Sequence, residues 1–248
     1  EIIIESKKKT IKALDELIKS RFIEMFDDLN CPIKRMDEVC TLKSGTTFDK
    51  SLELRNGEIL YCKVSDMNLE GNEKYMFLSK TYVDSKTGRK FCLPKNSVIF
   101  PKRGGAIGTN KKRITFAATC VDLNTMGVIP SKNINIQYLY QYFQNLDLGS
   151  LCDGSTVPQL NNKNIGPLSI KIPSIEIQNE FASFVEQVDK SKFIYHSKYF
   201  LCDIFTLFSS TIAYSRVVSI FACPNIFCTC SIGMPLSIAF VANVLLNL

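Results

Sequence analysis

Hydrophobic positions near both ends of this 248-residue chain recur at the spacing of an α-helix. Intervals of three and four residues place such positions on one side of a helix and leave the other sides polar. The first apolar face comprises Ile11, Leu14, Ile18, Phe22 and Met25, and the second comprises Ile177, Phe181, Phe184 and Val188. The pattern predicts one helix within residues 1–29 and another from residue 175, with Ser174 as a candidate N-cap.

The residues between these helices follow a β-like pattern. From residue 33 to 134, short apolar runs are separated by Gly and Asn turn signals. The predicted strands are Arg35–Leu42, Ile59–Val64, Asn96–Phe100, Arg113–Ala118 and Val121–Val128. A helical period returns at 135–146, and a short strand of alternating Ile residues ends at Pro173. The predicted fold class is α+β, with a β-rich domain at 30–174 between two helices. These either pair as a coiled coil or pack on the domain as core helices.

The overall charge is mildly basic, with a formal net charge of +6 and a pI near 8.7. This balance is compatible with a nucleic-acid partner but does not require one. The ten Cys residues form no disulfide framework, and no secretory signal opens the chain. We therefore expect reduced thiols and a cytoplasmic protein.

A basic segment at 102–113 is the first candidate for nucleic-acid binding. Its cations surround three glycines and are Lys102, Arg103, Lys111, Lys112 and Arg113. Lysines there could contact phosphates, and the two arginines could read guanine edges. The segment is not a P-loop, because no Gly-Lys-Ser/Thr follows the glycines. The alternative is a solvated turn between two strands.

A polar loop at 153–164 offers further hydroxyl and amide groups. Ser155 and Thr156 suit contacts to a polar polymer, and Gln159 or Asn161 could pair with adenine. A self-bonded loop that supports the next strand is the interpretation we favour for Gln159. Catalysis has little support, since the only histidine, His196, lies outside the β-rich domain and no methyltransferase motif is present.

Five stretches, in order, resemble the specificity subunits of type I restriction-modification enzymes over about residues 10–195. They are Leu14–Phe26, Leu42–Thr47, Leu60–Met67, Leu93–Gly108 and Leu151–Gln178. The second is similar to the Ser-Gly-Gly-Thr-Pro turn that opens a target recognition domain in that family, with Thr46 and Thr47 in place of Gly and Pro. Lys43 and Thr46 of this turn join the candidate DNA contacts.

The resemblance implies a non-catalytic subunit that recognises a sequence in double-stranded DNA. In that family two recognition domains each read half of a split target, and paired helices set the distance between them. One domain with its helices resembles the second half of such a subunit, or a half-length subunit that joins a second half or dimerises. The implied partners are a methylation subunit, which docks on the helices, and a restriction subunit. S-adenosylmethionine, ATP and Mg would belong to those partners, and this chain would hold no cofactor.

The last part of the chain departs from that family. The resemblance implies a charged helix after residues 175–196, but only Lys198, Asp203 and Arg216 are charged between residues 197 and 248. We hypothesise that a frameshift replaced the native helix here. A membrane segment at 217–248, or a buried or disordered tail, is the alternative. Two other functions also stay open: a solitary nuclease or methyltransferase, and a protein attached to a membrane through this tail, although we expect no membrane partner.

Overall fold

The chain divides into two units, Glu1–Tyr195 and His196–Leu248. The computed structural model describes residues 2–152 and 157–209, and for residues 2–4, 7 and 194–209 only the course of the backbone. The fold described below is therefore that of the first unit.

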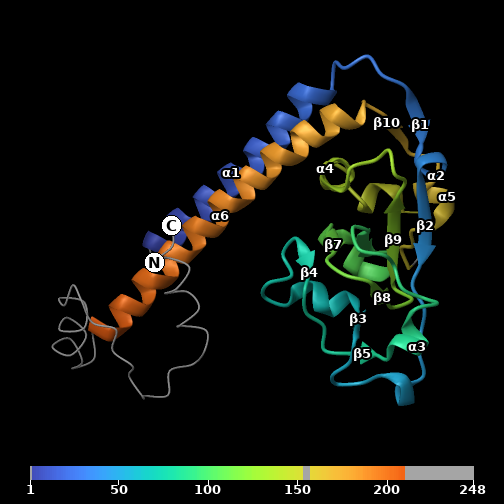
Figure 1. The fold of residues 1–248 in the computed structure, drawn as a ribbon, viewed down its shortest axis with the longest axis horizontal. Coiled ribbons are helices and arrows are strands. Elements are labelled where there is room, and N and C mark those ends of the chain that lie inside the picture. The colour runs from blue at the N-terminus through green and yellow to red at the C-terminus, as the bar shows by residue number, and fades with distance from the viewer. Residues whose placement is uncertain (1, 153–156, 210–248) are drawn as a thin grey trace. The chain divides into compact units, whose positions relative to one another are not determined.

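Short strands, short helices and loops lie between two long helices in this unit (Figure 1). The strands are β1 (Ile33–Arg35), β2 (Cys40–Ser44), β3 (Ile59–Cys62), β4 (Tyr75–Met76), β5 (Tyr82–Val83), β6 (Val98–Pro101), β7 (Arg113–Thr115), β8 (Thr119–Val121), β9 (Thr125–Pro130) and β10 (Ser169–Lys171). The α-helices are α1 (Ile2–Phe26), α2 (Met36–Val39), α3 (Ser85–Gly88), α4 (Ile136–Gln144), α5 (Asn162–Ile165) and α6 (Ile175–Ser209). The 3₁₀ turns are η1 (Lys50–Leu52), η2 (Val64–Asn68), η3 (Gly104–Thr109) and η4 (Gly149–Leu151). The predicted α+β class is confirmed.

Two of the predicted strands are each divided in the structure. The prediction of a single strand at Arg35–Leu42 is wrong, because α2 lies between β1 and β2. The single turn of α2 buries Met36 and Val39 on one side. The strand expected at Val121–Val128 is split by a turn at Asp122. That carboxylate accepts hydrogen bonds from the Thr125 hydroxyl at 2.7 Å and the Asn124 amide at 2.9 Å, a local competition that ends a strand.

A five-stranded sheet forms the centre of the domain, in the order β2-β9-β6-β7-β4. A three-stranded sheet, β5-β3-β8, lies in the part of the domain that also carries α3 (Figure 1). Strand β6 is buried along its whole length, as expected of a strand covered on both faces. Phe100 of β6 contacts Phe143 of α4, with ring centroids 5.4 Å apart, so that helix covers the central sheet.

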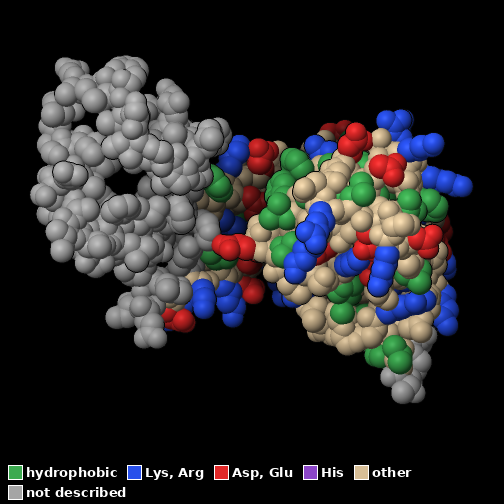
Figure 2. Space-filling model, turned by 90° about the horizontal axis from the view of Figure 1, so that it is seen from below, with side chains coloured by type: hydrophobic (Ala, Val, Ile, Leu, Met, Phe, Trp, Pro, Cys, Tyr) green, Lys and Arg blue, Asp and Glu red, His purple; other side chains and the backbone are tan. Residues whose placement is uncertain are grey.

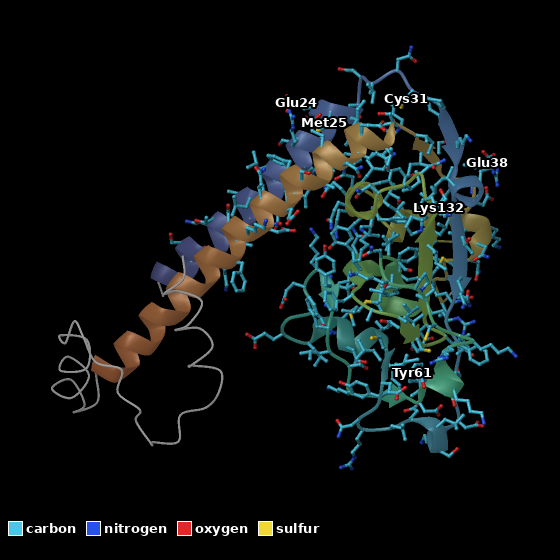
Figure 3. The ribbon with its side chains drawn as sticks, in the orientation of Figure 1. Glu24, Met25, Cys31, Glu38, Tyr61 and Lys132 are labelled. Atoms are coloured by element: carbon cyan, nitrogen blue, oxygen red, sulfur yellow. The ribbon has the colours of Figure 1, made fainter. Side chains whose placement is uncertain are left out.

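The first and last strands of the domain pair with each other. Ile33 of β1 lies opposite Lys171 of β10 in an antiparallel pair, which brings the end of α1 close to the start of α6. Cys31, labelled in Figure 3, lies in the connection between α1 and β1. The Lys171 ammonium donates to the carbonyls of Phe26, at 3.0 Å, and Asp27. Because α1 has no basic residue in its own last turn, this lysine supplies the positive charge that favours a helix C-terminus.

An aromatic cluster joins α1, α4 and α6. Phe22 and Phe26 of α1 contact Tyr138 of α4, with ring centroids 5.4 and 4.8 Å apart, and Phe181 of α6, at 5.4 and 5.6 Å. Phe26, Tyr138 and Phe181 are almost fully buried. Burying aromatic rings in such tilted contacts is a major source of stability in a small domain.

Ion pairs accompany this apolar contact along the two long helices. Arg21 and Asp15 of α1 pair with Glu180 and Lys192 of α6, at 3.2 and 2.6 Å. The earlier residue of α1, Asp15, pairs with the later residue of α6, Lys192, and the later residue of α1 pairs with the earlier residue of α6. Helix α1 and this part of α6 therefore run antiparallel. Lys74, which precedes β4, pairs with Asp189 of α6 at 2.5 Å.

Contacts within the chain bury or half-bury most side chains of the two predicted apolar faces. Three of these residues are buried in the main core, namely Ile18, Phe181 and Val188. Four more are half-buried and pack against that core, namely Leu14, Phe22, Ile177 and Phe184. Ile11 is also half-buried. Val185, which the sequence analysis missed, is buried with them. Contacts between the helices and contacts with the domain therefore occur together, and the coiled coil and subunit interface stay predictions.

Helix α6 continues past residue 196 to Ser209. Most of the tail to which the frameshift hypothesis applies, residues 210–248, lies outside the described residues. Within residues 2–152 and 157–209, no helix is long and apolar enough to span a bilayer.

Candidate nucleic-acid interface

Two of the predicted DNA-contacting lysines are buried. Lys102 is 5% exposed and its ammonium donates to the Ser44 hydroxyl at 2.8 Å. Lys112 is 1% exposed and donates to the Asn110 side-chain oxygen at 2.7 Å and the Leu146 carbonyl at 2.8 Å. Burial lowers the pKa of both, that of Lys112 to about 8. Both ammonium groups are therefore held by other residues of the domain.

Other predicted cations are also engaged by the protein itself. Arg113 donates from Nη1 to the Lys112 carbonyl at 2.8 Å and from Nη2 to the Met67 carbonyl at 2.9 Å. Burial lowers the pKa of Arg113. Lys43 donates to the Cys92 carbonyl at 2.9 Å, and Lys111 to the Asn68 side chain. These side chains connect loops to strands, so their DNA-contact roles stay predictions.

Arg103 is the exposed member of the set, and the fold places it beside the second predicted contact region. The Gly104 amide donates to the Pro158 carbonyl, and the Leu160 amide donates to the Lys102 carbonyl, both at 2.9 Å. Gln159 lies opposite Arg103 in the resulting β-bridge. This pairing supports the structural role favoured for Gln159. Ser155 and Thr156 lie outside the described residues.

The Gly45–Thr46 turn is a close crossing of backbones. The amides of Gly45 and Thr46 donate to the carbonyls of Thr125 and Val121, both at 3.0 Å. A Cβ at Gly45 would lie 2.0 Å from the Asp122 carbonyl oxygen, so only glycine fits. Thr46 also accepts a hydrogen bond at its carbonyl from the Tyr61 hydroxyl at 3.1 Å. The turn therefore holds the central sheet to the region of β8, and the proposed DNA contact by Thr46 stays a prediction.

A second basic segment, at 80–95, was missed from the sequence. Its cations are all exposed and are Lys80, Lys86, Arg89, Lys90 and Lys95, with Asp84 as the one carboxylate among them. Asp84 is engaged locally, because it accepts from the Thr87 amide at 2.8 Å and hydroxyl at 2.7 Å as the N-cap of α3. In the described part of the chain, none of the five cations makes an ion pair. Charge density along residues 80–95 was the signal that could have found it.

Figure 2 views the protein from the side on which α3 and β5 lie in Figure 1, and it shows Lys and Arg side chains over this face with hydrophobic side chains between them. A surface that combines exposed cations with apolar contacts is typical of a polyanion-binding face.

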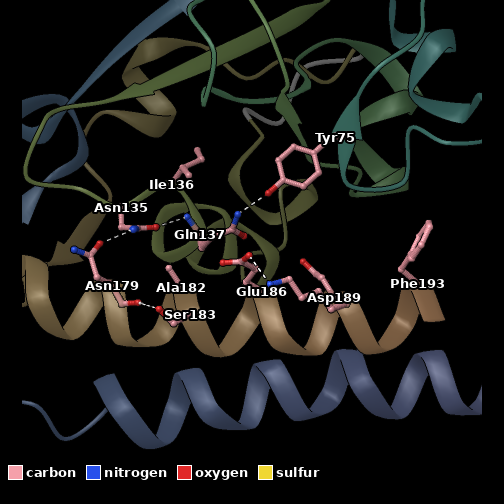
Figure 4. Close-up of a pocket in the computed structure, with 11 residues that line it drawn as sticks. Tyr75, Asn135, Ile136, Gln137, Asn179, Ala182, Ser183, Glu186, Asp189 and Phe193 are labelled. Atoms are coloured by element: carbon pink, nitrogen blue, oxygen red, sulfur yellow. Dashed lines mark hydrogen bonds and ion pairs between the residues drawn. The ribbon is translucent and has the colours of Figure 1, made fainter. Parts of the chain in front are cut away.

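A hollow of about 820 Å³ is lined by residues of α4 and α6 and by Tyr75 (Figure 4). The Gln137 amide donates to the Tyr75 hydroxyl at 2.6 Å, and the Asn135 amide donates to Asn179 at 2.8 Å. The first contact joins α4 to β4, and the second joins the N-cap of α4 to α6. Within the described residues, no three His, Cys, Asp or Glu side chains come together as metal ligands.

The fold defines, as a class, an α+β domain that carries an exposed basic segment. A family model described as "Type I restriction modification DNA specificity domain" matches residues 30–198. The chain therefore belongs to this family, which confirms the resemblance drawn from the sequence and the prediction of a DNA-specificity rather than a catalytic component.

Solved structures with a similar fold include two specificity subunits. The HsdS subunit from Thermoanaerobacter tengcongensis superposes with a TM-score of 0.58 at 14% identity, covering 79% of this chain and 48% of that one. The type I restriction-modification S subunit from M. genitalium superposes with a TM-score of 0.56 at 15% identity, covering 84% and 53%. A third, a chain of a type I R-M system, gives 0.59 at 15% identity, covering 77% and 47%. The chain thus spans about half the length of these relatives.

Proposed function

We propose that this chain recognises a sequence in double-stranded DNA as one non-catalytic half of a type I specificity subunit in the cytoplasm. Membership in the DNA specificity family supports this function. The methylation and restriction chemistry, with S-adenosylmethionine, ATP and Mg, belongs to partner subunits. Because the chain spans about half of the solved subunits, a second specificity half or a second copy would read the other half of the target.

The exposed basic segment at 80–95 is the observation that carries the DNA contact. The segment holds five exposed cations and one carboxylate, and that carboxylate already accepts hydrogen bonds as the N-cap of α3. Neutralising phosphates with such cations releases counterions, so DNA binding is expected to weaken steeply with salt. The buried Lys102 and Lys112 contribute by holding loops in place, whereas Arg103 and the basic segment offer charge to the solvent.

The test begins with selection of duplexes from a randomised pool by the full chain, at low and physiological salt. Enrichment of one sequence class supports recognition, and the absence of any preferred duplex would refute it. Affinity for the selected duplex is then measured against salt concentration. Each lost phosphate contact lowers the salt slope by about 0.9, so the double variant Lys86→Gln, Arg89→Gln is expected to lower it by up to about 1.8.

The matched control is Lys34→Gln, Lys132→Gln, which removes two exposed cations outside the segment. Lys132 lies beyond β9, away from Tyr61 of the smaller sheet (Figure 3). The control is expected to keep the wild-type slope. An unchanged slope in the Lys86, Arg89 variant would assign the phosphate contacts to another surface.

A further inference from the structure

Two phenylalanines lie side by side, each directly after the last residue of a strand of the central sheet. Strands β4 and β7 are parallel, with Met76 opposite Thr115, so the next residue of each strand emerges at the same edge. Those residues are Phe77 and Phe116, which are 46% and 48% exposed, and their ring centroids lie 4.5 Å apart. Leu78, also exposed, extends the apolar surface.

This aromatic pair stands on a rigid base. The amides of Phe77 and Leu78 donate to the Asn72 side-chain oxygen at 2.9 and 3.1 Å. Asn72 is fully buried, and its amide nitrogen donates to the carbonyls of Asp66 and Leu78, both at 2.8 Å. Every hydrogen-bonding group of that side chain is therefore used to fix the backbone that presents Phe77. A fixed apolar projection loses little conformational entropy when it meets a partner.

The charge around the pair indicates what it meets. The Lys95 ammonium lies 5.5 Å from the centroid of the Phe116 ring, and Lys80 follows Phe77 by three residues. Both lysines belong to the basic segment at 80–95 that carries the proposed phosphate contacts. Rings beside cations match the two parts of a nucleotide, since every base offers a π-face next to a phosphate.

We propose that Phe77 and Phe116 form an aromatic wedge that stacks against the bases of the bound duplex at a deformable step. Apolar side chains inserted between base pairs unstack and kink DNA, and flexible pyrimidine–purine steps yield at the lowest energy. The wedge would thereby add sequence preference without hydrogen bonds to base edges. This inference rests on the proposed function, because it assigns a reading device to the same DNA-binding face.

The experiment uses the full chain and the duplex it selects from the randomised pool, with 2-aminopurine placed at each position in turn. Wild type is expected to raise 2-aminopurine fluorescence at one step, which reports unstacking. Phe77→Ala, Phe116→Ala should abolish the rise and weaken binding of the selected duplex by about 5- to 100-fold. Affinity for an unselected duplex and the salt slope should stay near wild type, because the phosphate contacts remain.

Two further variants separate stacking from general surface effects. Phe116→Tyr keeps an aromatic ring and is expected to retain the fluorescence change. Phe193→Ala removes an exposed ring on α6 and should behave as wild type. The wedge is refuted if the double alanine variant binds and unstacks the selected duplex normally, or if it loses only co-purification with a methylation subunit, which would make the pair a protein-docking site. If wild type selects no duplex, the proposed function fails as well.

Discussion

Replacement of Lys112 by methionine separates a structural lysine from a DNA-binding one. The ammonium is buried against Asn110 and the Leu146 carbonyl, and burial lowers its pKa from the ordinary value of 10.5 to about 8. The unfolded chain therefore binds more protons than the folded chain between pH 8 and 10.5. The contribution of Lys112 to the free energy of unfolding consequently rises with pH across that window, and Lys112→Met removes this rise.

The size of the effect follows from the shift. Between pH 7 and pH 9.5 the shift corresponds to about 2 kcal/mol, and partial screening by water reduces this to about 1–2 kcal/mol. At pH 9.5 the Lys112 amine of the folded wild type is mostly neutral, which relieves much of the free-energy cost of burying it. The methionine variant also lacks the two hydrogen bonds that Lys112 makes to Asn110 and Leu146. The difference in unfolding free energy, wild type minus variant, should therefore grow by about 1–2 kcal/mol from pH 7 to pH 9.5.

The assay is urea unfolding at pH 7, 8, 9 and 9.5. Taking the difference between the two proteins is necessary, because burial raises the pKa of Cys40 and Cys62 to about 12, and these thiols lower stability as the pH rises. Lys132→Met, at an exposed position, should change stability by less than about 0.5 kcal/mol throughout. A pH-independent difference for Lys112→Met, together with a reduced salt slope for DNA, would refute the structural role and restore Lys112 as a phosphate contact.

Three further substitutions test contacts that hold the fold together. Phe181→Ala should lower the free energy of unfolding by about 3–5 kcal/mol, because it removes the fully buried ring of the aromatic cluster; Phe193→Ala, at a 71% exposed ring, should cost less than about 0.5 kcal/mol. Gly45→Ala should lower the free energy of unfolding by at least about 2 kcal/mol, since its Cβ would lie 2.0 Å from a backbone oxygen of Asp122. A thermal midpoint equal to that of wild type would contradict this close approach of the two backbone segments. Lys171→Met should speed amide exchange in the last turn of α1 and cost about 1–2 kcal/mol, and unchanged exchange there would show that this helix end is held by other contacts.

The three longer helices, α1, α4 and α6, and most of the strands could be predicted because their signals are local. Spacings of three and four residues identified the apolar faces of α1 and α6, and a continuous apolar run identified the buried strand β6. Strands β4 and β5 were missed, since each has two residues and is defined by its partners rather than by its own pattern. The strand predicted across Met36 failed for a related reason: a single buried turn gives no periodicity to detect.

The candidate site was harder to predict because burial of a lysine is a tertiary property. Residues 102–113 read as a dense run of cations, yet Asn110, in the left-handed conformation at φ 54°, ends η3 and accepts the hydrogen bond of the Lys112 ammonium. Nothing in the sequence distinguishes that lysine from the exposed Lys86. The general preference for exposed lysine favoured surface positions for Lys102 and Lys112, whereas the structure buries both side chains.

The division of the basic residues into buried and exposed groups has a functional consequence. Lys102, Lys112 and Lys171 join segments that are distant in sequence, so substituting them should change stability first and DNA affinity only through it. The cations at 80–95 make no ion pair within the described residues, so substituting them should change affinity and its salt dependence at constant stability. The aromatic pair at Phe77 and Phe116 belongs to neither group, because its loss should change discrimination between duplexes while stability and the salt slope stay fixed. Three separable observables, namely unfolding free energy, salt slope and the ratio of affinities for selected and unselected duplexes, thus assign each residue of this surface to holding the fold, contacting phosphates or reading the base sequence.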